Sequence, residues 1–263
     1  MTTTKPVVVV IPIHREEPSD IEKIGLCQAL KVFKNYPIVF QTSRGLNTAW
    51  YKKFCQDKVP VEFRESPFNS FSEYNTVLHD PAFFASFNDY EYMMVCHMDA
   101  FPFRDELPQW CSSGYDVIGG VVYERGWEEN VKLTTRLFGL RTPPYYFNGG
   151  FILYKNTVMT NVLSNLPFSV KMFKEFHRLR RNGVYPLNDI MLAQIQHKFK
   201  DFLKIPEKHV AARFGANLMD DYDLKLLSFT NKDLSSLPFG AHGWFRWQKD
   251  FWKPCIESYG YQL

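Results

Sequence analysis

The stretch DYEYMMVCHMDAF, from Asp89 to Phe101, decides the fold class. Its apolar part, Tyr92 to Cys96, predicts a strand buried on both faces, since a strand with one solvent face alternates polar and apolar residues. His97 and Asp99 follow two residues apart, so in an extended chain both side chains point to the same side. A buried carboxylate is costly unless it is paired or binds a cation, and ligands of open α/β sheets bind at this end of the strands. The alternative is an Asp that caps the next turn, and the spacing alone does not separate the two.

Strand-like and helix-like segments alternate ahead of this stretch. Val7–Ile11 is a continuous β-branched run, as in a central parallel strand. The β-α-β-α-β order predicts a parallel sheet with right-handed crossovers, and therefore an α/β fold. The other predicted elements are strands at 36–40 and 59–64 and helices at 21–33, 50–54, 72–78 and 81–87.

The second half of the chain gives weaker patterns. Residues 147–154 predict a glycine turn leading into a strand. Taken alone, Asn148-Gly149-Gly150 favours a hairpin turn, because Asn-Gly is the commonest hairpin signal; paired glycines also let a backbone approach a ligand closely. Weak strands are expected at 205–210 and 225–228. No internal repeat or linker is visible, so we expect one domain spanning residues 1–263.

Composition narrows the class of protein only modestly. The chain has 263 residues, of which 45% are hydrophobic, and a formal net charge of +3 without blocks of like charge. This balance neither identifies nor excludes a nucleic-acid binder. Five scattered cysteines without a CxxC pair argue against a zinc site or a disulfide framework and fit a reducing compartment. Because no apolar run is long enough for a signal segment or a membrane span, we expect a cytoplasmic protein.

Chemistry-bearing residues lie at separated loop ends. The sequence has no GxxxxGK[ST], no GxGxxG after the first strand and no GxSxG, which argues against three common enzyme classes. Asn188-Asp189 opens a predicted helix, so Asp189 is either a helix cap or a general base that deprotonates an acceptor hydroxyl. His242, between Gly240-Ala241 and Gly243, is accessible and able to complete a metal or phosphate site. For Asp99, hard oxygen ligands suit Mg²⁺ or Mn²⁺.

With these residues in hand, the chain resembles the GT-A class of nucleotide-sugar glycosyltransferases. It is most similar to a bacterial and fungal family of largely uncharacterised domains assigned to this activity. The order of its segments and the long central block make the resemblance specific. The segments are VVVVIPIHRE, CQALKVFKNYPIVF, SEYNTVL, DYEYMMVCHMDAFPFRDELPQWCSSGYDVIGG, FNGGFILYK, LNDI and LPFGAHGW followed by FW.

The resemblance implies a GT-A fold, a Rossmann-like α/β/α sandwich with a mixed, mostly parallel sheet. It implies that Asp99 and His242 hold Mn²⁺ or Mg²⁺ and that Asp189 is the catalytic base of an inverting enzyme. Two residues depart from the class: His97 replaces the first acid of the DxD-type motif, and Asn188 stands where Glu is usual. The residues expected to bind the donor are Pro12, His14, Arg15, Thr42, Asn75, His97, Asp99, Asn148, Gly149 and Gly150.

The sequence therefore favours a glycosyltransferase that moves a sugar from a nucleotide-diphosphate donor, most simply a UDP-sugar, to an acceptor hydroxyl. The acceptor is a glycan, a small molecule or modified DNA. Two alternatives stay open. One is a nucleotide-sugar or glycan binding module without transferase activity, which the replaced acid at His97 supports. The other is a transferase acting on hydroxymethylated bases of DNA, which the net charge of +3 permits.

Overall fold

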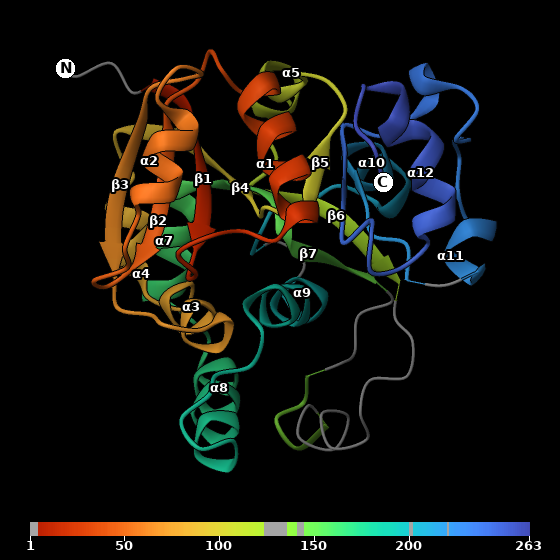
Figure 1. Cartoon of the computed structure of the whole chain (residues 1–263). Coiled ribbons are helices and arrows are strands. Elements are labelled where there is room, and N and C mark those ends of the chain that lie inside the picture. Colours follow the sequence, from red (N-terminus) through yellow and green to blue (C-terminus); the bar gives the residue numbers. More distant parts are fainter. Residues whose placement is uncertain (1–4, 124–135, 141–144, 200–201, 220) are drawn as a thin grey trace.

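A computed structural model describes residues 5–123, 136–140, 145–199, 202–219 and 221–263. Within these residues, nine strands form one mixed, mostly parallel sheet in the order β3-β2-β1-β4-β7-β6-β8-β9-β5 (Figure 1). The strands are β1 (Lys5–Ile13), β2 (Ile38–Ser43), β3 (Val61–Ser66), β4 (Tyr90–Cys96), β5 (Ala100–Pro102), β6 (Val117–Tyr123), β7 (Tyr145–Lys155), β8 (Gly215–Ala216) and β9 (Gly240–His242).

The first four strands of the sheet are parallel, and the central strands β1 and β4 are buried over most of their length. β1 pairs in parallel with β2 and β4, and β2 pairs in parallel with β3. Val7, Val8, Val9 and Val10 of β1 are at most 2% exposed, because strands lie on both sides of β1 and helices cover the sheet. The expectation of an α/β fold built around Val7–Ile11 and Tyr92–Cys96 is therefore confirmed.

Helices cover both faces of this sheet. In Figure 1, α1 and α2 lie on one face, while α4 and α7 pack together on the other. Ser19 and Glu22 form a capping box at the start of α1, which fixes where this helix begins. The helices are α1 (Asp20–Val32), α2 (Ala49–Cys55), α3 (Phe71–Val77), α4 (Pro81–Ala85), α5 (Leu107–Ser112), α7 (Asn156–Ser164), α8 (Phe168–Arg180), α9 (Asn188–Lys198), α10 (Lys208–Phe214), α11 (Asp221–Lys225), α12 (Lys249–Ser258) and the 3₁₀ helix η1 (Leu234–Ser236).

The sheet curls back on itself after β4. Only residues 97–99 separate β4 from β5, yet β5 lies at the far edge of the sheet, beyond β7, β6, β8 and β9. α1 packs on this turn through Gly25, where an added Cβ would lie 2.2 Å from the Met98 carbonyl oxygen. Gln28, one turn further along α1, donates to the Pro102 carbonyl at 2.9 Å. The curl brings β9 and its His242 back to the carboxyl end of β4.

The second half of the chain departs from the sequence patterns. Asn148-Gly149-Gly150 is not a hairpin turn: it lies inside the continuous strand β7 as a bulge, where the pairing with β6 shifts register. The predicted strands at 205–210 and 225–228 are also wrong, since α10 begins at Lys208 and α11 ends at Lys225. Residues 205–207 form a loop, in which the apolar side chains of Ile205 and Pro206 line a cavity instead of pairing in a sheet.

In the part of the chain that the structure describes, no helix combines the length and apolar character needed to cross a membrane.

Candidate active site

The turn after β4 carries two of the predicted site residues. His97, Met98 and Asp99 form a tight turn rather than an extended chain, closed by the Ala100 N–H, which donates to the His97 carbonyl at 3.0 Å. Asp99 is 6% exposed. Its Oδ1 lies 3.1 Å from His242 Nε2 and its Oδ2 lies 3.2 Å from an Arg246 guanidinium nitrogen. The carboxylate is thus engaged with cationic and imidazole groups.

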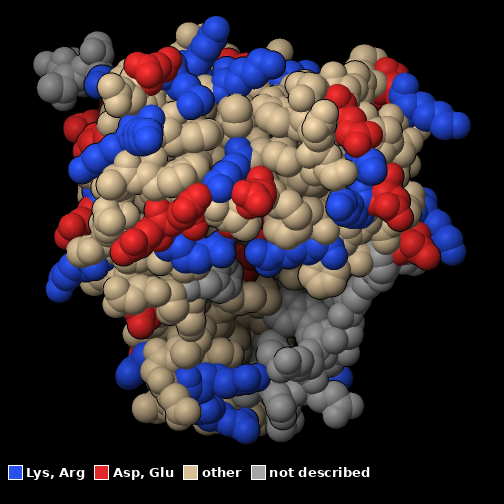
Figure 2. Space-filling model, in the orientation of Figure 1, with Lys and Arg blue, Asp and Glu red and all other residues tan. Residues whose placement is uncertain are grey.

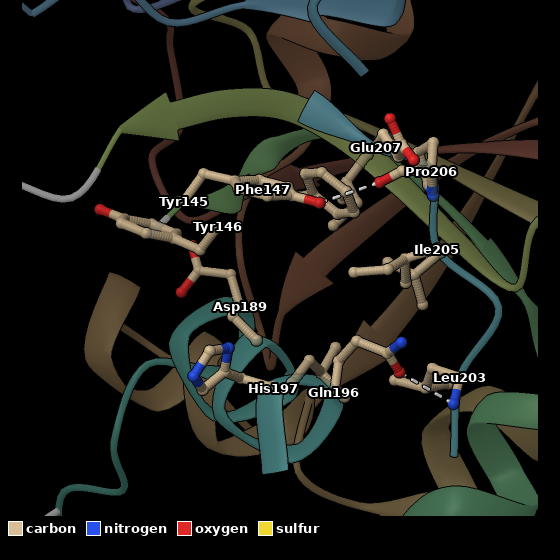
Figure 3. Close-up of a pocket in the computed structure, with 14 residues that line it drawn as sticks. Tyr145, Tyr146, Phe147, Asp189, Gln196, His197, Leu203, Ile205, Pro206 and Glu207 are labelled. Carbon is tan, nitrogen blue, oxygen red and sulfur yellow. Dashed lines mark hydrogen bonds between the residues drawn. The ribbon is translucent and has the colours of Figure 1, made fainter. Parts of the chain in front are cut away.

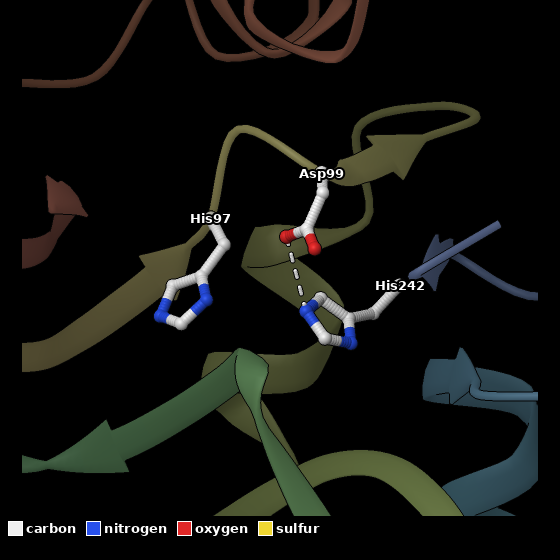
Figure 4. Close-up of side chains that lie close together, drawn as sticks. All are labelled: His97, Asp99 and His242. Carbon is white, nitrogen blue, oxygen red and sulfur yellow. Dashed lines mark ion pairs between the residues drawn. The ribbon is translucent and has the colours of Figure 1, made fainter. Parts of the chain in front are cut away.

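His97, Asp99 and His242 converge into one cluster. Each offers a ligand atom, and these atoms all lie within 4.8 Å of one another (Figure 4). His242 comes from β9, and its Nδ1 lies 3.0 Å from Asn217 Oδ1. Because the amide oxygen only accepts, this contact places a proton on Nδ1 and directs Nε2 at Asp99. A ring held in this way through its second nitrogen is the usual arrangement of a metal-ligating histidine.

The electrostatics of the cluster suit a cation. Burial raises the pKa of Asp99, but His242, His97 and Arg246 outweigh it, so the net pKa lies below its ordinary value and the carboxylate stays ionised. Burial lowers the pKa of His97 to about 4, although Asp99 opposes this shift. His97 is therefore neutral at neutral pH, the state in which imidazole binds metal ions.

The bulge Asn148–Gly150 links this cluster to Asp189. The His97 N–H donates to the Gly150 carbonyl at 2.8 Å, and the Gly149 N–H donates to Asp189 Oδ2 at 3.2 Å. Asn148 Oδ1 accepts from the Gly150 N–H at 2.7 Å, which closes the bulge locally. One irregular segment of β7 therefore contacts both groups of candidate functional residues.

Asp189 lies in the first turn of α9. Its Oδ1 accepts from the Ile190 N–H at 2.7 Å, and its Oδ2 accepts from Gly149 on β7. Burial raises the pKa of Asp189 to about 6, against the opposing effect of the Ile190 and Gly149 N–H groups. The carboxylate is consequently ionised at pH 7 but more basic than an ordinary Asp, a combination that suits a general base.

A clamp from α3 holds the residues that precede Asp189. Asn75 is 4% exposed; its Oδ1 accepts from the Asn188 N–H at 2.8 Å and its Nδ2 donates to the Pro186 carbonyl at 3.0 Å. His79 Nε2 lies 2.7 Å from the same Pro186 carbonyl. Asn188 Nδ2 donates to the Leu78 carbonyl at 2.7 Å. The side chain of Asn75 is thus engaged in fixing the start of α9.

The histidine–aspartate cluster, the bulge of β7, Asn75, Asn188 and Asp189 line one cleft of about 450 Å³. Pro12, His14 and Arg15, at the end of β1, also line it. Thr42 is not among its lining residues: it is 2% exposed at the end of β2, where its hydroxyl lies 3.4 Å from the Arg64 carbonyl. The other predicted site residues that line the cleft are Asn75, His97, Asp99, Asn148, Gly149, Gly150, Asp189 and His242.

The sequence patterns did not single out Arg246 or Asn217 as site residues. Arg246 follows the β9 turn; its side chain is 56% exposed and lines the cleft beside Trp247. Gly243, three residues earlier, has a φ of +63°; its N–H donates to the Asp99 carbonyl at 3.0 Å, and its carbonyl accepts from the Arg246 N–H at 3.0 Å. Asn217 follows β8 in a segment without a motif, so only the pairing of β8 with β9 reveals its place beside His242.

The structure is similar to solved glycosyltransferases. Mouse xyloside xylosyltransferase 1, in its apo form, matches with a TM-score of 0.53 at 7% identity, over 91% of this chain and 97% of that chain. The galactosyltransferase LgtC, solved in complex with donor and acceptor sugar analogs, matches with a TM-score of 0.53 at 13% identity, over 89% of this chain and 86% of that chain. The predicted GT-A glycosyltransferase fold is therefore confirmed.

The chain belongs to the family described as protein of unknown function, DUF5672, whose sequence profile matches residues 59–242. This range includes the turn after β4, the bulge of β7, the start of α9 and His242. No curated protein sequence matches the chain.

Proposed function

We propose that the protein is a metal-assisted, inverting glycosyltransferase that uses a nucleoside diphosphate sugar, most simply a UDP-sugar, as donor. The observation that carries the proposal is the bulge at Gly149-Gly150, which contacts the candidate base Asp189 and the cluster of His97, Asp99 and His242. A base and a cation-binding cluster in one cleft are what glycosyl transfer to a hydroxyl needs. LgtC, which has the same fold, binds donor and acceptor sugar analogs.

The donor set fits a divalent cation. Two imidazoles and one carboxylate lie within 4.8 Å of one another, and His242 Nε2 faces Asp99 Oδ1 at 3.1 Å. The contact of Nδ1 with Asn217 leaves Nε2 facing Asp99 Oδ1, so a cation bound between these two atoms would contact both. Imidazole ligands favour Mn²⁺ over Mg²⁺, which prefers an all-oxygen shell. When bound, the ion supplies neutralisation of the charge that develops on the leaving diphosphate.

Different side chains of the cleft bind the diphosphate and accept the proton of the acceptor. Arg246 and Arg15 offer guanidinium groups to the diphosphate. The acceptor oxygen forms a bond to the anomeric carbon while the bond from that carbon to the diphosphate oxygen breaks, and the electron pair leaves with the diphosphate. The acceptor proton passes to the Asp189 carboxylate. Attack on the face opposite the leaving group inverts the anomeric configuration.

The charge distribution on the face drawn in Figure 2 does not support DNA as the acceptor. Figure 2 shows Asp and Glu side chains interspersed among Lys and Arg over most of the face drawn. A protein that binds duplex DNA presents a continuous basic surface, because its affinity for the duplex comes chiefly from contacts with the phosphates. A glycan or a small molecule is therefore the favoured acceptor class.

Proton NMR of the reaction tests the proposal. The protein is incubated with Mn²⁺, a candidate acceptor and UDP-glucose, UDP-galactose, UDP-xylose or UDP-N-acetylglucosamine, and the anomeric signals of donor and glycoside product are followed. We expect consumption of one donor and a new anomeric doublet with the coupling of the inverted configuration. A product that retains the donor configuration contradicts the role of Asp189. Donor binding without consumption, in the presence of candidate acceptors, indicates the binding module instead.

A further inference from the structure

A second cavity adjoins the cleft at Asp189. Its volume is about 590 Å³, within the range of small-molecule sites. Figure 3 shows Tyr145, Tyr146 and Phe147 of β7 on one side, Asp189, Gln196 and His197 of α9 on another, and the segment 203–207 closing a third. Asp189 and Tyr146 line both this cavity and the cleft. The two spaces therefore meet at the candidate base.

The two spaces differ in charge. The cleft is lined by the cations Arg15 and Arg246, by the histidine–aspartate cluster and by the carboxylates Glu22 and Asp189. Among the described residues that line the second cavity there is no Lys or Arg, and the carboxylates are Asp189 and Glu207. A diphosphate needs cationic partners once it leaves water. The cleft therefore suits the donor, and the second cavity does not suit a second anionic group.

The walls of the second cavity are mainly apolar and aromatic. Apolar lining residues include Val117, Phe147, Ile152, Leu192 and Ile205. The rings of Tyr145 and Phe147 lie with their centroids 6.0 Å apart at 49°, which forms an aromatic wall. Such walls favour flat apolar groups.

Two polar groups of the wall already have partners within the protein. The Tyr145 hydroxyl donates to the Pro206 carbonyl at 3.1 Å, and Gln196 Oε1 accepts from the Leu203 N–H at 3.1 Å. Tyr146, His197 and Glu207 are the other polar side chains of the wall beside Asp189. A sugar ring carries a hydroxyl on most of its carbons and loses free energy for each one buried without a partner. A planar ring with one hydroxyl needs one polar partner, and Asp189 supplies it.

We propose that this cavity is the acceptor site and that the acceptor is an uncharged aromatic alcohol or phenol. The inference rests on the proposed function. The aromatic ring lies between Tyr145, Phe147 and Leu192, and the hydroxyl reaches Asp189. The hydroxyl oxygen bonds to the anomeric carbon as the diphosphate leaves with the electron pair, and its proton passes to Asp189. The products are an O-glycoside and a nucleoside diphosphate.

The test compares acceptors in the presence of Mn²⁺ and the four UDP-sugars. 4-Methylumbelliferone and 2-phenylethanol probe the aromatic class, and glucose and lactose probe the polyhydroxylated class. Mass spectrometry measures transfer, and release of UDP without acceptor measures donor hydrolysis in parallel. We expect glycosylation of the aromatic probes in preference to the sugars. A preference for glucose or lactose overturns the inference while leaving the proposed function intact.

A variant that fills the cavity locates the acceptor. Ala193, on α9, lines the second cavity but not the cleft, so Ala193→Phe places a ring inside it. The ratio of transfer to hydrolysis should fall about tenfold, as for mismatched apolar pockets. The control is Ala85→Phe, a half-buried position on α4 that lines neither cavity and should keep the wild-type ratio. An unchanged ratio in Ala193→Phe overturns the inference.

A direct binding measurement separates the acceptor inference from the proposed function. If no UDP-sugar is turned over with any acceptor, the proposed function fails, and fluorescence titration of 4-methylumbelliferone then tests the cavity alone. If 4-methylumbelliferone binds the wild type and Ala193→Phe weakens this binding about tenfold, the aromatic ligand class is supported. No binding, or equal binding by the variant, overturns it.

Discussion

The imidazole of His242 occupies the space that a side chain on Gly150 would fill. An ideal Cβ on Gly150 would lie 2.1 Å from His242 Nε2, well inside van der Waals contact. The same Gly150 accepts from the His97 N–H through its carbonyl at 2.8 Å. Because Gly150 has no side chain, His242 of β9 can pack against it and reach Asp99, close to His97 at the end of β4.

Replacing Gly150 tests this packing. Gly150→Ala should drive the His242 ring away from Asp99 and abolish or strongly weaken Mn²⁺ binding, measured by isothermal titration calorimetry. Gly120→Ala is the matched control on the adjacent strand β6, because its nearest neighbour would lie at an ordinary 3.6 Å. The control should bind Mn²⁺ like the wild type. Equal Mn²⁺ affinity in Gly150→Ala would show that this close approach does not build the site.

Removing the candidate base should stop turnover. Asp189→Asn should lower the turnover number by about 10²–10⁴, the usual contribution of a general base, with little change in donor affinity. Asp116→Asn is the control: Asp116 is a half-buried carboxylate that accepts from the Lys204 N–H at 2.7 Å and lines neither cavity. It should retain wild-type turnover. A loss of donor affinity as large as the loss of turnover would argue for a binding role instead.

The pKa of Asp189 predicts how rate and stability depend on pH. Since burial raises this pKa to about 6, and the ionised carboxylate is the active base, the wild-type rate should rise through pH 6 and level off above it. The folded state holds the Asp189 proton more tightly than the unfolded state, so its contribution to stability is present below about pH 4 and is lost as pH rises through about 6. The Tm of the wild type relative to Asp189→Asn should therefore fall over this interval. A pH-independent difference would contradict the raised pKa.

The clamp at Asn75 should affect catalysis beyond its effect on stability. Asn75→Ala removes both side-chain bonds to residues 186–188 and should lower the Tm and the turnover number together. Asn156→Ala is the control, because Asn156 bridges the Phe87 and Tyr90 carbonyls away from both cavities. Each change should cost about 1–3 kcal/mol of stability. Only Asn75→Ala should slow turnover of the folded enzyme; an equal effect of both would remove Asn75 from the positioning of Asp189.

Arg246 is expected to bind the diphosphate. Arg246→Gln should raise the donor KM about tenfold or more, the effect of losing a charge-assisted hydrogen bond. Arg64→Gln provides the comparison, since Arg64 pairs with Glu62 and lines neither cavity. Initial rates over a range of UDP-sugar concentrations measure both variants. An unchanged KM in Arg246→Gln would mean that this side chain serves only to pair with Asp99.

The sequence predicted the first half of the fold well, because β1, α1 and β4 carry strong local patterns. It failed at β7, where Asn148-Gly149 gives a local turn signal and the long-range pairing with β6 and β4 holds the segment in a strand. β8 and β9 are two and three residues long and exist only through their partners, so no periodicity reveals them. For the same reason, Asn217 and Arg246 were missed.

Site residues were predictable where the residue type and its immediate sequence neighbours indicate a chemical role. Asp99 stands out as an acid between apolar residues, and His242 as a histidine among glycines. Their mutual contact at 3.1 Å depends on the curl of the sheet, which the sequence patterns do not contain. The clamp that fixes Asp189 joins Asn75 to Asn188, which are 113 residues apart, and is likewise visible only in the fold.

The most direct test of the central claim is the rate of UDP release from UDP-sugars, measured with Mn²⁺ for the wild type and for Asp189→Asn and Asp99→Ala. We expect the wild type to release UDP and to stop when EDTA removes the metal. Asp189→Asn should release UDP about 10²–10⁴ times more slowly. Asp99→Ala should lose both the activity and its dependence on the metal. Release at the wild-type rate by either variant, or no release by the wild type from any donor, would contradict glycosyl transfer at this cleft.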